Sequence, residues 1–115
     1  MKDTDLELLE LAAKAAGIEV RRGEGWQSDM LFRRVKKPSS PLVAGVHWNP
    51  LDDDGDSRLL QVALRLTLCM HSDGAAMCVS GDGKHGVEVR DQADPAANAR
   101  MAVLLLAAEI GKGMA

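Results

Sequence analysis

Apolar side chains recur at the spacing of an α-helix in three separate stretches of the chain. This spacing predicts helices over residues 5–16, 56–66 and 95–112. In each stretch the apolar positions fall on one side, so each helix needs a partner surface to cover it. The expected buried stripe of the last helix consists of Ala97, Met101, Leu104, Leu105 and Ala108.

Residues that favour helix ends flank all three stretches. Thr4, with a glutamate three residues later, has the spacing of a capping box, and Gly17 follows the first helix. Asp56 is the expected N-cap of the second helix. Asp94-Pro95 combines an N-cap with a proline at the first helical position, so the third helix has the clearest start.

Short apolar runs lie between these stretches, separated by clusters of Gly, Pro and Asp. They predict strands over residues 18–22, 30–35, 42–48, 68–71, 76–79 and 87–90. Helices and strands do not alternate in the regular way that a parallel sheet requires. We therefore expect an α+β fold, with residues 1–115 as a single domain. In it, a small antiparallel or mixed sheet packs against about three helices.

The clearest hairpin joins the strands at 68–71 and 76–79 through a two-residue Asp73-Gly74 turn. In that register Cys69 lies directly opposite Cys78, with His71 on the same face. Two reduced, partly buried cysteines are the favoured interpretation. A zinc site would need His47 or His85 as a further ligand, and no CxxC or HxxxH spacing supports one. A Cys/His nucleophile is a further alternative, but no sequence motif orients such a pair.

The composition restricts the classes of function. The net charge of −3 and the pI of about 5.5 repel phosphate backbones, so general nucleic-acid binding is disfavoured. No apolar run has the length of a membrane span, and the N-terminus lacks the pattern of a signal peptide. Two cysteines in 115 residues fit a reducing compartment. We expect a cytoplasmic, non-enzymatic protein that binds no membrane, metal or cofactor.

An acidic loop with a tryptophan at its start is the first candidate for a binding site. Its aspartates suggest a calcium loop, but the EF-hand pattern fails, because Ser57 and Ala63 stand where glycine and glutamate are needed. Capping of the following helix is the simpler interpretation. Trp48 itself is expected either to fill the core or to contact a partner. The candidate partner-binding residues are Trp48, Asn49, Asp52, Asp53, Asp54 and Asp56.

A basic segment is the second candidate site, for an anion. Six of the fourteen Lys and Arg residues fall between residues 21 and 37, with Trp26 and Phe32 among them. Arginine pairs bind phosphates in bidentate fashion, and a tryptophan can stack on a base. The alternative is that the charges simply lie in solvent and discourage strand pairing. The candidate anion-binding residues are Trp26, Arg21, Arg22, Arg33 and Arg34.

Several segments resemble a family of short phage and prophage proteins of unknown function. The resemblance lies in the segments Trp48-Asn49-Pro50-Leu51 and Asp53-Asp54-Gly55-Asp56, and in the leucine-rich helix after them. The same resemblance extends to the helix that begins at Asp94-Pro95 and to the run from Leu8 to Gly17. The C-terminal part is similar, more loosely, to the NinX-like proteins of lambdoid phages. This resemblance implies a phage or prophage origin and an action on the bacterial host.

These observations lead to a working hypothesis of an accessory binding protein that occupies a host protein, such as a defence component. In one mechanism the Trp48 loop and its aspartates dock a basic partner. In the other, the arginines and Trp26 sequester a nucleotide-like anion, between the subunits of a homo-oligomer. A hydrolase or zinc-dependent enzyme is the third alternative.

Overall fold

The computed structural model describes residues 3–36 and 43–114. It contains three α-helices and two antiparallel sheets of three strands each, so the α+β prediction is confirmed. The elements in chain order are α1 (Asp3–Ala16), β1 (Val20–Arg22), the 3₁₀ turn η1 (Gly25–Gln27), β2 (Leu31–Lys36), β3 (Val43–His47), α2 (Asp54–Ala63), β4 (Thr67–Met70), β5 (Ala76–Val79), β6 (Gly86–Val89) and α3 (Pro95–Lys112). Within the described residues, no helix combines the length and the apolar character needed to cross a bilayer.

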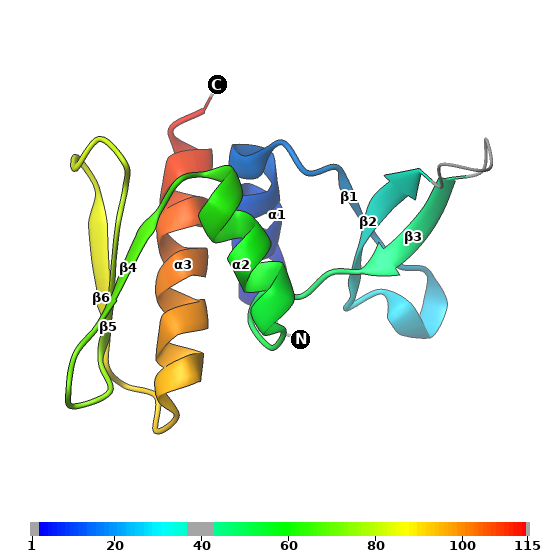
Figure 1. Cartoon of the computed structure of the whole chain (residues 1–115). Helices are drawn as coiled ribbons and strands as arrows, with labels where there is room; N and C mark the ends of the chain where they lie inside the picture. Colours follow the sequence, from blue (N-terminus) through cyan, green and yellow to red (C-terminus); the bar gives the residue numbers. More distant parts are fainter. Residues whose placement is uncertain (1–2, 37–42, 115) are drawn as a thin grey trace.

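Helix α3 lies at the centre of the molecule. One side of it packs against the sheet β4-β5-β6, and its other side packs against α1 and α2 (Figure 1). A helix that is covered from two sides must be apolar over most of its circumference. The predicted stripe was therefore too narrow. Met101 and Leu105 are only half-buried, whereas Ala102, Val103 and Leu106 are fully buried.

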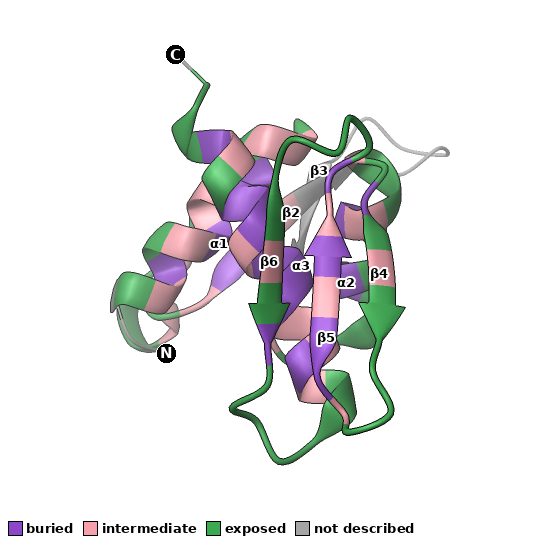
Figure 2. Ribbon diagram, turned by 90° about the vertical axis from the view of Figure 1, so that its left-hand side faces the viewer, coloured by how far each residue is buried: buried purple, intermediate pink, exposed green. Residues whose placement is uncertain are grey.

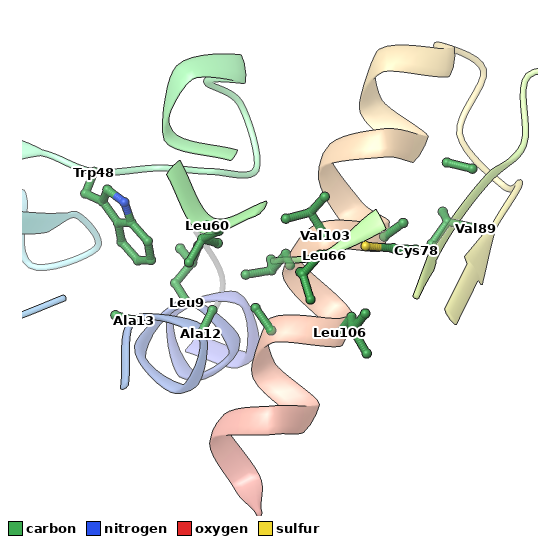
Figure 3. Packing of buried hydrophobic residues seen from close by; sticks show 14 of the residues in the cluster. Leu9, Ala12, Ala13, Trp48, Leu60, Leu66, Cys78, Val89, Val103 and Leu106 are labelled. Atoms are coloured by element: carbon green, nitrogen blue, oxygen red, sulfur yellow. The ribbon is translucent and has the colours of Figure 1, made fainter. Parts of the chain in front are cut away.

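The sheet of β4, β5 and β6 has one covered face and one exposed face. Figure 2 shows the buried positions concentrated on the central strand β5, with mainly exposed residues on the outer strands. Ala76 and Cys78 of β5 point toward α3 and join the buried core, which is drawn in Figure 3. The exposed face of this sheet carries Cys69, His71 and Glu88.

The other three strands form a second sheet, with β2 between β1 and β3, that projects from the helices (Figure 1). The prediction of one sheet was wrong, because α2 carries the chain from β3 to the opposite side of α3 before β4 begins. Leu31 and Trp48 anchor the projecting sheet in the core. The backbone N–H of Trp48 donates to the carbonyl oxygen of Leu31 at 2.8 Å.

The register of the β4–β5 hairpin differs from the predicted one by one residue. The turn has three residues, closed by a hydrogen bond from the His71 N–H to the Ala75 carbonyl at 2.8 Å. Gly74 adopts a φ of 92°, which favours glycine. This turn places Cys69 opposite Met77 and Leu68 opposite Cys78. The two cysteines are therefore on opposite faces of the sheet and not directly opposed.

The first two helices begin at residues that differ from the predicted ones. Helix α1 includes Asp3, so Thr4 lies inside the helix and is not its N-cap. Helix α2 starts earlier than predicted, with Asp53 as the N-cap in place of Asp56. The start of α3 is as predicted, since Asp94 accepts a hydrogen bond from the Ala96 N–H and Pro95 is the first helical residue.

Helices α1 and α3 cross at very short distance near their C-terminal ends. A Cβ atom added to Gly111 would lie 2.1 Å from the carbonyl oxygen of Leu11 and 2.8 Å from its carbonyl carbon. Only glycine permits this approach, because both obstructing atoms belong to the backbone and cannot rotate away. The crossing therefore fixes the distance between the two helices.

We expect Gly111→Ala to lower the free energy of unfolding by about 1–3 kcal/mol, because the helices must move apart and the core loosens. Gly113→Ala is the matched control, since its added Cβ would lie 3.5 Å from the nearest atom, an ordinary contact distance. Urea unfolding followed by circular dichroism measures both. Equal effects of the two substitutions would contradict the crossing geometry.

Candidate functional site

Trp48 occupies the core and not a contact surface. Its exposed fraction is 0%, and its ring points toward α1 and Leu60 (Figure 3). Of the two roles considered for Trp48, the structure supports core filling. Its buried Nε1 has no hydrogen-bond partner in the described part of the chain. A partner cannot reach this side chain, so Trp48 is removed from the candidate contact residues.

The acidic loop after Trp48 is held together by its own aspartates. The Asp53 carboxylate accepts hydrogen bonds from the N–H groups of Gly55 at 2.7 Å and Asp56 at 3.2 Å, which caps α2. Asp54 and Asp56 add negative charge to the first helical turn, where the helix dipole favours it. The prediction that the acidic stretch caps the second helix is confirmed, with the cap at Asp53.

Asp56 and Asn49 connect the two ends of this loop. The Asp56 Oδ2 atom accepts a hydrogen bond from the backbone N–H of Asn49 at 2.9 Å, and both residues are buried. The Asn49 side chain donates to Asp52 at 3.1 Å and accepts from the Leu51 N–H at 3.1 Å. Asn49 and Asp56 thus stabilise the loop. From the sequence, both residues were expected to contact a partner.

Arg100 of α3 fastens the same loop to the central helix. Its Nε donates to the Leu51 carbonyl at 2.7 Å, and its Nη1 forms an ion pair with Asp54 at 2.7 Å. The guanidinium is mostly buried, with 16% exposed, whereas the Asp54 side chain is 78% exposed. Asp52, Asp53 and Asp54 are therefore the exposed aspartates of the candidate acidic surface, and each already has an internal contact.

A cavity of about 450 Å³ lies beside this loop, between the first turns of α1 and α3. Its lining is of mixed charge and includes Asp5, His47, Asp52, Gln92 and Arg100. Within the described residues, no group of three or more His, Cys, Asp or Glu is arranged to hold a metal ion.

The arginines of the second candidate site do not converge. Arg21, Phe32 and His47 form one row across the projecting sheet and share its outer face. Arg22 lies on the opposite face, where it pairs with Glu10 of α1 at 2.6 Å. Arg33 also lies on that inner face, and its Nε is buried without a partner among the described residues. The side chain of Arg34 lies outside the described atoms.

Trp26 is the most exposed large apolar side chain of the described chain, at 84%. It stands on η1, a turn closed by hydrogen bonds from the Gln27 N–H to Glu24 at 3.1 Å and from the Ser28 N–H to Gly25 at 3.1 Å. Gly23 lets this turn fold against β2, because an added Cβ would lie 2.4 Å from the carbonyl oxygen of Gln27. The turn therefore fixes the backbone at Trp26 and presents its side chain to solvent.

A shallow groove of about 270 Å³ follows the outer face next to this turn. Arg21, Glu24, Gln27 and Phe32 line it. The rings of Phe32 and His47 lie beside each other, with centroids 5.8 Å apart and planes tilted by 54°. Arg21 is exposed, and no ion pair or hydrogen bond of its side chain occurs within the described residues. We define the Trp26 surface as Arg21, Trp26, Phe32 and His47.

The cysteines and histidines do not form a common site. Cys69 and His71 lie on the exposed face of the β4–β6 sheet, whereas Cys78 lies on its buried face. His47 belongs to the other sheet, and His85 lies in the turn before β6. His71 instead approaches Glu88 at 3.6 Å, beside the Glu88–Arg90 ion pair at 2.6 Å. The arrangement of these side chains does not support the zinc or Cys/His alternatives.

Comparisons of the chain with protein-family models, with curated proteins and with solved structures found no match.

We expect Asp56→Ala to lower the free energy of unfolding by about 1–3 kcal/mol, because the buried Asn49 N–H loses its acceptor. Asp54→Ala is the control, since it removes a largely exposed carboxylate and should cost less than about 1 kcal/mol. Thermal and urea unfolding measure both variants. A larger effect at Asp54 would contradict the structural role assigned to Asp56.

We expect one thiol of the native protein, that of Cys69, to react rapidly with a disulfide reagent at pH 8. Burial raises the pKa of the Cys78 thiol to about 11, so at pH 8 Cys78 is protonated as well as inaccessible. Its reaction should follow only after denaturation. Cys69→Ser should remove the rapid phase and leave the slow one, and two equally fast thiols in the native protein would disprove this assignment.

Proposed function

We propose that this chain is a non-catalytic binding protein that docks to a protein partner through the Trp26 surface. The observation that carries the proposal is the 84% exposure of Trp26 on a hydrogen-bonded turn. An isolated tryptophan in water has no stabilising role in the fold, whereas tryptophan is among the residues enriched at the centres of protein interfaces. The fixed turn also lowers the entropy lost when the side chain is ordered on binding.

The other residues of the Trp26 surface define the chemistry of the expected partner. An apolar pocket would accept the indole, and a carboxylate next to that pocket would pair with the exposed guanidinium of Arg21. Phe32 and His47 would extend the contact along the outer face of the sheet. This surface combines aromatic and cationic groups, as interface centres commonly do.

Neither of the two surfaces expected from the sequence supports binding as well. The aspartates of the acidic loop are engaged in capping α2 and in fastening it to α3. The arginines expected to hold an anion are divided between the two faces of the projecting sheet. The proposal therefore retains a binding protein, as the sequence predicts, but assigns binding to the Trp26 surface in place of the acidic loop or the arginines.

The resemblance to phage and prophage proteins supports a further part of the proposal, which concerns the identity of the partner. We infer that the chain acts in the cytoplasm of a bacterial host and occupies a host protein, such as a component of an antiviral defence.

Trp26→Ala tests the docking surface directly. We expect the free energy of unfolding to change by less than about 0.5 kcal/mol, because the side chain contributes no buried contact. Binding to the partner should weaken by about thirtyfold or more, the usual loss at an interface hot spot. Met114→Ala is the control, since Met114 is also an exposed apolar residue but follows α3.

The measurement has two stages. Proteins captured from a bacterial lysate by the wild type, by Trp26→Ala and by Met114→Ala are compared quantitatively, and a candidate lost only with Trp26→Ala is then purified and titrated by calorimetry. A dissociation constant that is the same for wild type and Trp26→Ala refutes the proposal. A bound nucleotide that native mass spectrometry detects, and that Arg21→Ala removes, would instead support anion sequestration.

A further inference from the structure

Strand β4 is an edge of the β4–β6 sheet that has neither a charged residue nor a proline to discourage pairing. Its residues Thr67, Leu68, Cys69 and Met70 carry no charge, and it contains no proline. The opposite edge, β6, carries Glu88 in an ion pair with Arg90. Natural sheets commonly place charges, prolines or a covering segment at their edges, because a free edge pairs with other strands. An uncovered, uncharged edge is therefore a candidate interface.

The hairpin geometry shows which backbone groups of β4 point outward. His71 and Ala75 form a hydrogen-bonded pair at the turn. Hydrogen-bonded and non-hydrogen-bonded pairs alternate along an antiparallel ladder, so Cys69 and Met77 form the next pair that is hydrogen-bonded. The N–H and C=O groups of Leu68 and Met70 consequently point away from β5. They are free to pair with another strand.

We propose that a second copy of this chain covers β4, and that the two β4 strands pair in antiparallel fashion about a two-fold axis perpendicular to the sheet. Such an axis places residues of the same sheet face opposite each other. The outward-pointing groups of Leu68 then pair with those of Met70 in the partner subunit. Cys69 lies on the axis, opposite the partner's Cys69.

Charge complementarity favours the register with Cys69 on the two-fold axis over the symmetric register with Leu68 on the axis. At each end of the pairing, Arg65, just before β4, comes near the partner's hairpin turn, which carries Asp73. The alternative, with Leu68 opposite the partner's Leu68, shifts Arg65 toward the partner's His71. The first register therefore places a basic residue near an acidic turn at both ends of the interface, and the strand between them has no like charges to repel.

Helix α2 supplies the apolar area that a short strand pairing lacks. Leu59 is 44% exposed and Val62 is 66% exposed. Although α2 and the sheet pack against opposite faces of α3, α2 and β4 both lie toward the front in Figure 1 and to the right of α3 in Figure 2, so a second copy at the β4 edge would also face α2. Two short strands alone bury less surface than stable dimers use, about 1,200–2,000 Å² in total, and the α2 side chains extend the contact.

Cys69→Lys tests the interface, because it places two lysines opposite each other on the axis while the side chain stays on the solvent-exposed face. Light scattering of the wild type should give the mass of two 12.3 kDa chains. The substitution should raise the dissociation constant of the dimer by about tenfold or more. The matched control, Gly86→Lys, adds a lysine to the opposite edge at a position with ordinary contact distances, and it should remain dimeric.

A wild-type mass of one chain throughout a dilution series would overturn the proposal, and so would a dimer that Cys69→Lys leaves intact. A second measurement keeps the test valid if that variant fails to fold. A short bismaleimide added to the wild type should link the two Cys69 thiols in high yield at dilutions where free monomers do not react, and Cys69→Ser should abolish the link. Absence of the link at concentrations where light scattering shows a dimer would also refute this interface. Trp26 lies on η1, between two strands of the other sheet, so these outcomes are independent of the proposed function.

Discussion

The close crossing of α1 and α3 at Gly111 is the constraint on which the rest of the structure depends. The two backbones almost touch there, so α1 packs closely against one side of α3, which α2 also covers, and the β4–β6 sheet covers the other side. Small residues such as Ala107 and Ala108 fill the narrow space that remains. The central helix has no further free side, so the first three strands form a separate sheet that projects from the core.

The loop between Trp48 and Asp56 joins these two parts of the molecule. Trp48 fills the core at the base of the projecting sheet, Asp56 closes the loop through Asn49, and Arg100 fastens it to α3. A dense group of acidic residues can therefore arise from local structural needs alone: one cap, one buried acceptor and one ion pair. This explains why the most conspicuous charge cluster in the sequence contributes little free surface for a partner.

Much of the fold follows from local signals, and the rest depends on contacts that a sequence does not display. Asp94-Pro95 specifies the start of α3 by capping chemistry alone, and periodicity predicts that all three helices exist. Asp73-Gly74 is compatible with turns of two or three residues, and contacts with α3 favour the longer one: Leu68 and Cys78 pack in the core, and Asn98 donates to the Gly74 carbonyl. Likewise, nothing local distinguishes Trp26 from Trp48, since burial depends on which surface the finished core leaves uncovered.

The two surfaces that remain uncovered lie on different sheets, on opposite sides of α3. Dimerisation through β4 would therefore leave both copies of the Trp26 surface free and would direct them away from the shared axis. A partner that is itself dimeric, or that repeats one surface, could engage both copies. The second contact would then form at a high effective concentration, so a small aromatic surface could yield tight binding without further contacts. The small size of the Trp26 surface, on a chain of only 115 residues, is thus compatible with effective occupation of a host protein.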